Sequence, residues 1–440
     1  MNPRLVVHSV CGGWSGRTRL KVVAAALGGA CAAVVLLATS CQPAPDPPAA
    51  QPYVLLGWNN LGMHCYNQDS SDFLVLPPYN TLQAQVIQAG DPPQILTTGV
   101  SVEYSFPANT YSAGNAGHPD KTNFWQNVNA LFGVNLAPNI GLTGKGLVDY
   151  MDVADRTFLA DGIPLTEYRD EDARLGVDSS HWQRHPYQLA LLVARDAATG
   201  AKLAENTIVA PVSSELSCDL CHADDGDATT TYPITPTGSI AQNILALHDY
   251  LSAAQYPPAF PALLMDSRPV LCAKCHASNA LGVAGVPGVT SLSNAMHNRH
   301  KDLADITPDT DGCYTCHPGP QTQCLRCTMS ESFALDCITC HGTMADVAVN
   351  PDPWLNEPRC DNFTCHGPGY ALNQALYRNS TGHGGIYCAG CHDSPYAITP
   401  SREGNDGIKF INLQGRTGTL RDCTVCHLTQ PMAGFVHGSP

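Results

Sequence analysis

The chain has 440 residues, of which 44% are hydrophobic and 14% are charged, and its formal net charge is −15. This composition is typical of a folded globular protein, and the acidic balance excludes binding of nucleic acid or anionic lipid through a basic face. The 38 Gly and 34 Pro residues indicate many loops, and 20 Cys residues indicate disulfides, metal or haem.

The first 40 residues predict an export signal. Residues 1–21 are basic, and residues 22–37 are apolar but too short and too rich in Ala and Gly for a permanent membrane span. The run ends in Leu37-Ala-Thr-Ser-Cys41, which is similar to a bacterial lipobox, so we expect lipid attachment at Cys41. The alternative is cleavage by the general signal peptidase without lipid. The Pro-rich residues 41–52 predict an extended tether.

Residues 53–212 contain none of the repeated cysteine motifs that begin at Cys218, and they predict a β-rich, sandwich-like domain. Short apolar or alternating segments are separated by Gly, Pro, Asn and Asp, as is typical of such domains. The clearest segments are 53–58, 81–88, 99–106, 189–194 and 203–210. Residues 213–440 predict short helices and loops.

One pattern recurs six times after residue 217: two cysteines separated by two residues and followed directly by histidine. The copies are Cys218-Asp-Leu-Cys221-His222, Cys272-Ala-Lys-Cys275-His276, Cys313-Tyr-Thr-Cys316-His317, Cys337-Ile-Thr-Cys340-His341, Cys388-Ala-Gly-Cys391-His392 and Cys423-Thr-Val-Cys426-His427. This is the c-type haem attachment motif, in which both sulfurs bond to the haem and the histidine ligates its iron. Zinc is the alternative reading, but zinc sites do not require a histidine after the second cysteine.

A seventh motif has a longer spacer. Cys360-Asp-Asn-Phe-Thr-Cys365-His366 lies 25 residues after His341 and 26 before His392, where a haem site is expected. We count it as a haem site, so that the prediction is seven covalently bound haem c groups; a local disulfide is the alternative.

An eighth cysteine pair, Cys324-Leu-Arg-Cys327, is followed by Thr328 and lacks the proximal histidine. We therefore do not expect haem there. We expect one thiol to form a disulfide instead, with Cys65 as the hypothesised partner of Cys324 and Cys327 left free.

Electron-transfer haems usually have a second strong iron ligand. After the seven proximal histidines, nine remain outside the leader: His64, His118, His181, His185, His248, His297, His300, His383 and His437. Our distal candidates are His64, His185, His248, His297, His300, His383 and His437. Met63 and Met296 are weaker alternatives.

The positions of these histidines carry two further predictions. Residues 213–440 offer only five of the nine, so full bis-histidine ligation needs at least two ligands from the N-terminal domain or another subunit. His297 and His300 follow Ser291, which predicts a Ser-capped helix with both rings on one face. His248 ends the amphipathic run 240–247, which also predicts a helix.

The mature chain resembles a family of exported multihaem c-type cytochromes of metal-reducing and related bacteria. The resemblance rests on Gly57-Trp-Asn-Asn-Leu-Gly-Met-His-Cys65, Leu76-Pro-Pro-Tyr-Asn80, Pro211-Val-Ser-Ser-Glu-Leu-Ser-Cys218, Ser291-Leu-Ser-Asn-Ala-Met-His297 and His317-Pro-Gly-Pro-Gln-Thr-Gln-Cys-Leu-Arg326. It implies a multihaem cytochrome exported to the periplasm or the cell surface. The resemblance also implies an acidic residue at position 327, a pattern from which Cys327 departs.

We therefore expect an electron carrier rather than an enzyme, passing electrons to redox proteins or an extracellular acceptor. One alternative is a multihaem reductase of nitrogen or sulfur oxyanions, although no motif has Lys in place of the proximal histidine. Another is a polymerising cytochrome in which a histidine ligates a haem of a neighbouring subunit.

Overall fold

The computed structural model describes residues 52–431, apart from 261, 304–305, 308, 320, 356, 358, 364 and 371. The predicted signal, the lipidation site Cys41, the tether up to residue 51 and His437 lie outside the described residues.

One antiparallel sheet begins at β1 (Tyr53–Asn59). It has the order β1-β4-β9-β8, with β5 paired to β4. The other strands are β4 (Thr81–Gln88), β5 (Gln94–Leu96), β8 (Asp152–Ala154) and β9 (Thr157–Asp161). Leu56 pairs with Gln85, and this register sets which apolar side chains of β1 and β4 share a face.

The second sheet has the order β2-β11-β10-β6-β7. Its strands are β2 (His64–Cys65), β6 (Val100–Ser105), β7 (Asp149–Tyr150), β10 (Tyr187–Asp196) and β11 (Lys202–Ser213). Only β2 runs parallel to its neighbour, with His64 opposite Val212. This pairing holds the candidate ligand His64 at the edge of the sheet.

The two sheets pack face to face through one apolar core. Leu55 and Val86 of the first sheet share this cluster with Val102, Leu192 and Ile208 of the second. At Gly57 the sheets approach so closely that a Cβ atom would overlap Leu192 and crowd Ile208. The N-terminal part is therefore a β-sandwich.

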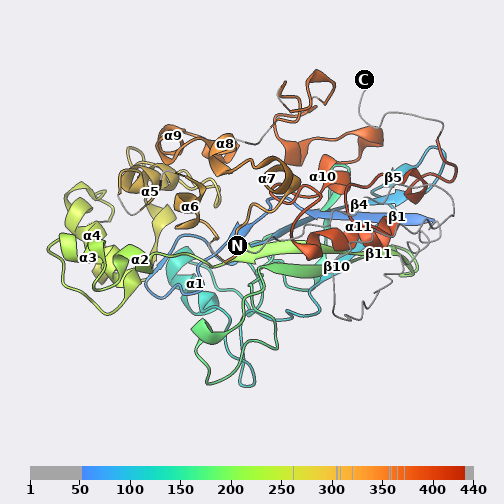
Figure 1. The fold of residues 1–440 in the computed structure, drawn as a ribbon. Coiled ribbons are helices and arrows are strands. Elements are labelled where there is room, and N and C mark those ends of the chain that lie inside the picture. Colours follow the sequence, from blue (N-terminus) through green and yellow to red (C-terminus); the bar gives the residue numbers. More distant parts are fainter. Residues whose placement is uncertain are drawn as a thin grey trace, which may run out of the picture. The chain divides into compact units, whose positions relative to one another are not determined.

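The first sheet is covered on its other face as well. Val54, Leu56 and Trp58 form a second cluster with Tyr377 and Ala389. Successive side chains of a strand point to opposite faces, so the nearly continuous burial of β1 reflects contact on both sides. Figure 1 shows α10 (Cys388–His392) and α11 (Ile408–Gln414) beside the long strands.

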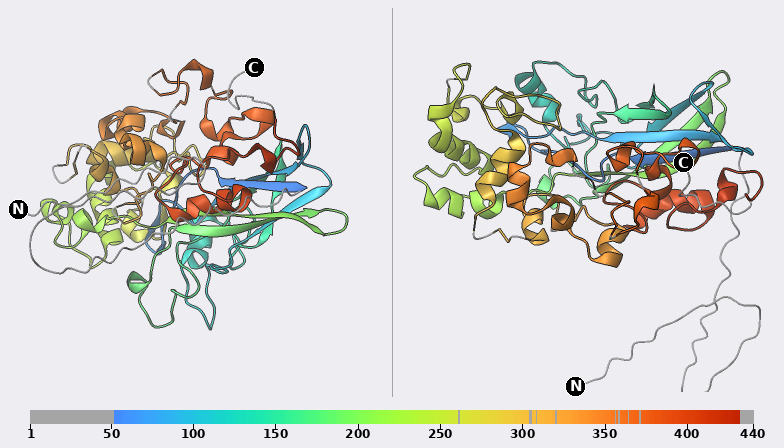
Figure 2. Two further views of the ribbon diagram at one scale, coloured as in Figure 1. Left: turned by 45° about the vertical axis from the view of Figure 1, so that its right-hand side comes forward. Right: turned by 90° about the horizontal axis from the view of Figure 1, so that it is seen from above.

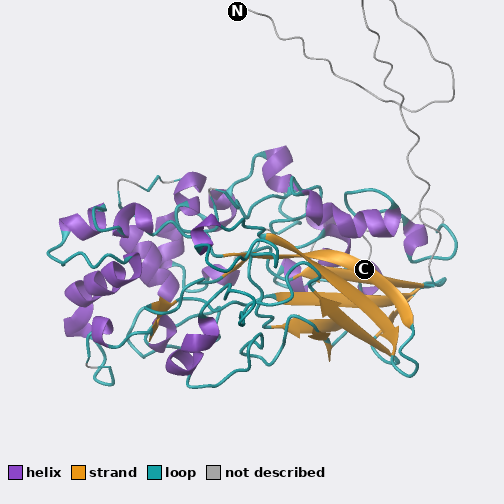
Figure 3. Cartoon of the chain, turned by 90° about the horizontal axis from the view of Figure 1, so that it is seen from below, coloured by secondary structure: helices purple, strands orange, loops and turns teal. Residues whose placement is uncertain are grey.

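The C-terminal part consists of short helices and connecting loops (Figure 3). Its other α-helices are α2 (Asp219–His222), α3 (Asp227–Thr231), α4 (Ile240–Ser252), α5 (Leu292–His300), α6 (Thr310–Tyr314), α7 (Thr328–Phe333), α8 (Cys337–His341) and α9 (Met344–Val349), whereas α1 (Phe124–Phe132) belongs to the N-terminal part. The 3₁₀ helices are η1 (Ser179–His181), which also belongs to the N-terminal part, η2 (Ala253–Gln255), η3 (Leu264–Asp266), η4 (Cys272–Lys274), η5 (Pro353–Leu355), η6 (Pro368–Tyr370), η7 (Tyr377–Asn379), η8 (His383–Gly385), η9 (Gly404–Gly407) and η10 (Cys423–Val425).

Segments distant in the sequence join the two parts. Two short strands, β3 (Phe73–Leu74) and β12 (Val270–Leu271), pair in parallel. Both views of Figure 2 show the helices of residues 219–300 grouped beyond one end of the long strands. All described residues belong to one unit, 46–440, so the sandwich and the helical part do not separate into two units. Among these residues no helix is both long and apolar enough to cross a membrane.

Candidate functional site

Each regular cysteine-histidine motif folds as a single helical turn. The histidine N–H donates to the carbonyl of the first cysteine at 2.9 Å in His222, 3.1 Å in His276 and 2.9 Å in His427. A helical turn places residues i and i+3 on one face, so the spacing directs both thiols to the same side. The following histidine then completes a set of three side chains.

The motif with the long spacer keeps this turn but begins it elsewhere. The N–H groups of Cys365 and His366 both donate to the carbonyl of Asn362, at 2.9 and 3.2 Å. Asn362 therefore takes the position that the first cysteine has in a regular motif, and Cys360 lies two residues earlier. The expansion changes where the first sulfur is attached, and the turn that carries the second sulfur and the histidine is retained.

All seven motifs line one cavity of about 3790 Å³. A single ligand site typically has a volume of about 300–1,000 Å³, so this cavity has room for several large ligands. The motif residues on its wall are Cys218, Cys221, His222, Cys272, Cys275, His276, Cys313, Cys316, His317, Cys337, Cys340, His341, Cys360, Cys365, His366, Cys388, Cys391, His392, Cys423, Cys426 and His427.

Four proximal histidines face a second histidine across this cavity. The ring centroids are 6.5 Å apart in His222–His300, 6.2 Å in His276–His248, 6.0 Å in His317–His297 and 6.0 Å in His427–His383. Two imidazoles on opposite sides of one metal ion, each bound at about 2 Å, have centroids roughly 6 Å apart. These pairs therefore fit a six-coordinate haem iron.

Hydrogen bonds at Nδ1 turn the other ring nitrogen of several histidines toward the cavity. Nδ1 lies 2.8 Å from the Thr290 carbonyl oxygen in His276, 2.8 Å from that of Ser293 in His297, and 2.7 Å from that of Met296 in His300. A carbonyl oxygen can only accept, so Nδ1 carries the proton and Nε2 keeps a lone pair for a metal.

The same tautomer follows at His248 through a tyrosine. The Tyr256 hydroxyl donates its only proton to Asp249 Oδ1 at 2.6 Å. Its oxygen therefore accepts from His248 Nδ1, which lies 2.9 Å away, and Nε2 is again left with its lone pair.

The helices that carry these ligands match the sequence prediction. The Ser-capped helix is confirmed as α5, in which the Ser291 hydroxyl accepts from the Asn294 N–H at 3.2 Å. His297 and His300 lie one turn apart on α5 and face the third and first motifs, respectively. The predicted helix before His248 is confirmed as α4, which extends to Ser252.

His64 is a buried ligand candidate on the sandwich. It lines the cavity, and its Nε2 atom is buried without a hydrogen-bond partner. Burial lowers the pKa of His64 to about 3. Burial is also the largest cause that lowers the pKa of His222 and of His317 to about 4. All three rings are therefore neutral at neutral pH and have a lone pair free for a metal.

The structure does not bring every histidine to this cavity. His185, one of our distal candidates, is absent from the wall, and its Nε2 lies 3.0 Å from Asp172 Oδ2. The structure therefore does not bring His185 to the cavity, and its role as a distal ligand stays a prediction. His118 and His181 also lie outside the wall, whereas both Met63 and Met296 are part of it.

Electrostatic effects between thiols show which of the motifs are neighbours. Burial is the main reason why the pKa of Cys316 is raised to about 11, and the charges of Cys218 and Cys221 raise it further. Burial and then the charge of Cys360 raise the pKa of Cys388 to about 11, and burial and then Cys391 raise that of Cys426 to about 12. The first and third motifs are therefore neighbours, as are the fifth and sixth and the sixth and seventh.

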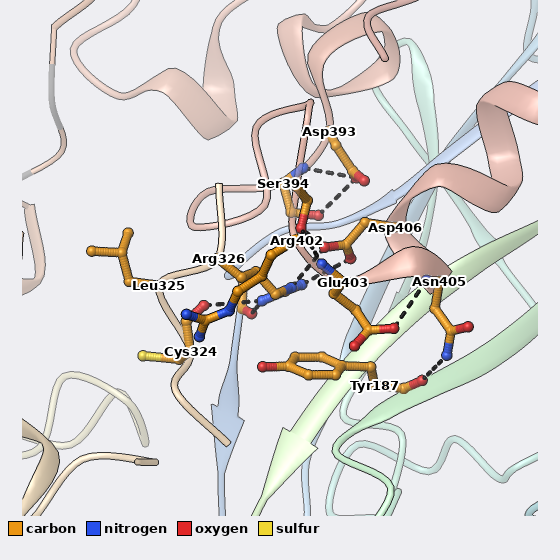
Figure 4. A network of polar contacts seen from close by, with 12 residues as sticks. Tyr187, Cys324, Leu325, Arg326, Asp393, Ser394, Arg402, Glu403, Asn405 and Asp406 are labelled. Carbon is orange, nitrogen blue, oxygen red and sulfur yellow. Dashed lines mark hydrogen bonds and ion pairs between the residues drawn. The ribbon is translucent and has the colours of Figure 1, made fainter. Parts of the chain in front are cut away.

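The segment of the cysteine pair that lacks a histidine, residues 324–328, is held in place by hydrogen bonds and a buried ion pair. Arg326 N–H donates to the Tyr396 carbonyl and Thr328 N–H to that of Ile398, both at 3.0 Å. The Arg326 side chain is fully buried and forms two hydrogen bonds with the Asp406 carboxylate, at 2.8 and 3.1 Å (Figure 4). It also donates to the Gly62 carbonyl at 2.8 Å and lies over the Tyr187 ring.

The hypothesised Cys65–Cys324 disulfide is not formed. Both are free thiols, and Cys327 is a buried free thiol. A disulfide requires its two sulfurs at about 2.05 Å, which these side chains do not adopt. Burial and, secondly, the charge of Cys324 raise the pKa of Cys65 to about 12. This effect shows that the two thiols are near each other.

Within the described residues, no group of three or more His, Cys, Asp or Glu side chains is arranged to hold a bare metal ion. A haem iron needs only two axial protein ligands, since the porphyrin supplies the other four.

Two site residues had no signal in the sequence motifs. Tyr396, whose hydroxyl lies 3.1 Å from His341 Nε2, and Tyr256, which orients His248, both belong to loops outside the motifs. Only their position in the fold reveals them.

No family model, curated protein or solved structure matches this chain.

Proposed function

We propose that the chain is an exported multihaem c-type cytochrome that carries electrons through seven haem c groups. The carrying observation is the single cavity whose wall contains all seven motifs and four facing histidine pairs. The sequence resemblance to exported multihaem cytochromes supports the same class.

The proposed roles follow from the positions on the cavity wall. The fourteen motif cysteines form thioethers, and the seven motif histidines are the proximal ligands. We propose His300, His248, His297 and His383 as the distal ligands of the first, second, third and seventh haems. His64 is proposed as a ligand from the sandwich, and His437 remains a prediction.

When bound, each haem supplies an iron that alternates between the ferrous and ferric states. The chain fixes both imidazoles of a pair, through the Nδ1 bonds of His276 to a carbonyl and of His248 to Tyr256. An unchanged ligand geometry keeps the structural cost of each oxidation change small. All seven sites line one cavity, so neighbouring haems would lie side by side. Electrons could then pass from haem to haem without any bond being made or broken.

The spatial order of the sites differs from their order in the chain. Because α5 carries the facing histidines of the first and third motifs on one face, these two haem sites would be neighbours along that face. We propose that electrons pass directly between the first and third sites.

The proposed location is the periplasm or the cell surface, with lipid attachment at Cys41 as the anchor. The proposed partners are redox proteins or an extracellular acceptor. The two expected alternatives, an oxyanion reductase and a polymerising cytochrome, remain hypotheses.

A spectroelectrochemical titration of the purified chain tests the proposal. We expect reversible oxidation and reduction with close to seven electrons per chain, and optical bands of low-spin haem c for most of them. A protein that takes up no electrons, or that contains zinc in place of haem, would contradict it.

A further inference from the structure

The seventh motif is contacted by a turn of the sandwich. Residues 89–93 connect β4 to β5, and the Gly90 N–H donates to the carbonyl of Cys426 at 3.1 Å. The next residue, Asp91, places its Oδ1 atom 3.2 Å from Nδ1 of His427, the histidine of this motif. A side chain 336 positions earlier in the sequence therefore lies beside a proposed iron ligand.

The carboxylate of Asp91 is held on both oxygens. Oδ2 accepts from the Thr429 hydroxyl at 2.7 Å, while Oδ1 faces His427. An ionised carboxylate can only accept, so Nδ1 of His427 carries the proton and Nε2 keeps its lone pair for iron. His427 is part of the cavity wall and Asp91 is not, so the carboxylate contacts the ring from behind the wall.

Two other motifs with a facing histidine have a different environment at Nδ1. In His276 this atom lies 2.8 Å from the carbonyl oxygen of Thr290, which carries no net charge. In His222 it is buried and has no hydrogen-bond partner among the described residues. The proximal histidine of the seventh motif therefore differs from these two in having a charged acceptor.

A charged acceptor changes the electronic character of the imidazole. Hydrogen bonds to an ionised group are roughly twice as strong as those between neutral groups. A carboxylate that draws on the Nδ1 proton makes the ring more basic, and therefore a stronger electron donor through Nε2. A stronger donor stabilises ferric iron more than ferrous iron, which lowers the reduction potential.

We propose that Asp91 is a positioning residue of the seventh haem, which orients the His427 ring and lowers the reduction potential of the haem that this ring ligates. The step concerned is the uptake of one electron from a redox partner, by which ferric iron becomes ferrous, and the proton stays on Nδ1 in both states. The inference rests on the proposed multihaem function and adds a residue of the sandwich that tunes one of the seven haems.

A redox titration of the intact holoprotein, with its seven haems verified by mass, tests this inference. Asp91→Asn removes the charge and retains the shape, so one of the seven one-electron steps should move to a higher potential. We expect its equilibrium constant to change about tenfold, which corresponds to about 59 mV for one electron. Asp91→Glu retains the charge and should keep most of the parent potential.

Two further variants make the test specific. Asp422→Asn removes the same charge beside the same motif, but Asp422 accepts from the Thr424 N–H at 3.1 Å, so this variant should shift the step less. Cys423→Ser/Cys426→Ser removes the attachment of the seventh haem, and in this six-haem background Asp91→Asn should shift none of the remaining steps.

Three results would overturn the inference while the electron-carrier proposal stands. They are an unchanged titration of Asp91→Asn, an equal shift in Asp422→Asn, and a shift that persists in the six-haem background. If no haem is attached to the parent chain, the proposed function itself fails.

Discussion

At the scale of single residues, the proposed haem ligation depends on pairs of histidines whose sequence positions do not reveal their pairing. His297 and His300 are three residues apart, yet one faces His317 and the other His222. The sequence predicts that both lie on one helix face, but the partner of each depends on loops that only the fold positions.

Replacing one distal histidine should change one haem. In His297→Ala, the iron held by His317 loses its second imidazole, so one low-spin haem should become high-spin. Electron paramagnetic resonance of the oxidised protein measures this change. His118→Gln is the matched control, because His118 lies off the cavity wall. An unchanged spectrum of His297→Ala would exclude the proposed pair.

The buried ion pair Arg326–Asp406 carries a second prediction at this scale. Both side chains are 1% exposed, so Arg326→Met leaves a carboxylate buried without its partner. We expect the free energy of unfolding to fall by about 3–5 kcal/mol, measured by denaturant titration. Arg326→Met combined with Asp406→Leu should restore much of the loss, because no unpaired charge then remains.

The matched control for that ion pair lies on the surface. The Lys202–Glu205 pair is about half exposed at both side chains, so Lys202→Met should cost less than about 1 kcal/mol. A loss in Arg326→Met no larger than in this control would show that the buried pair does not hold the loops together.

At the scale of elements, the sequence anticipated the parts that local chemistry determines. The expected strand at 53–58 is β1 (Tyr53–Asn59), and the Ser-capped helix is α5. Alternation and capping are local signals, so they can be read without the fold. The parallel pairing of β3 with β12 joins residues about 200 positions apart and has no local signal.

The cap of α5 should matter for stability. Ser291→Ala removes the hydroxyl that accepts from Asn294 N–H, and N-cap losses cost about 1 kcal/mol. We expect this decrease in the free energy of unfolding, with Ser291→Asp retaining most of the stability. Equal stability of the Ala and Asp variants would show that the cap contributes nothing.

The long-spacer motif yields a prediction about its turn. Because Asn362 occupies the place of a regular first cysteine, Cys360→Ser should leave a single thioether, at Cys365. The double variant Cys360→Ser/Asn362→Cys recreates the regular spacing and should restore two thioethers. Peptide mass mapping distinguishes the two products. A double variant with only one thioether would contradict the role given to the turn.

At the scale of the whole molecule, the cavity dominates the energetics. An unfilled enclosed cavity costs about 24 cal/mol per Å³, and a protein is stable by only about 5–15 kcal/mol. Even a tenth of the 3790 Å³ left empty and enclosed would use most of that stability. Haem bound along the wall would fill this space and so contribute to the stability of the fold.

Individual residues at the cavity show what could and could not be predicted from the sequence at this scale. Counting histidines predicts at least two ligands from the N-terminal part or from another subunit, and His64 on β2 reaches the cavity whereas His185 does not. The count could not separate them, because the contact of His185 Nε2 with Asp172 Oδ2 at 3.0 Å forms only in the folded chain. Tyr396 was missed for the same reason.

Absence of the haems should affect the two parts of the chain differently. The sandwich has its own apolar core, whereas the helical part surrounds the cavity. We expect that the chain produced without haem attachment is cleaved rapidly by protease within residues 219–427 and slowly within the sandwich. Limited proteolysis with mass mapping measures this contrast. Equal resistance of the two parts would argue against haem as the filling of the cavity.

The central claim is that seven haem c groups are attached at the seven motifs. Mass spectrometry of the intact holoprotein, followed by mapping of its haem peptides, tests it most directly. The account predicts seven haems per chain, with one on each motif including Cys360–His366 and none on Cys324 or Cys327. A mass with fewer than seven haems, or a haem peptide that contains Cys324 or Cys327, would contradict it.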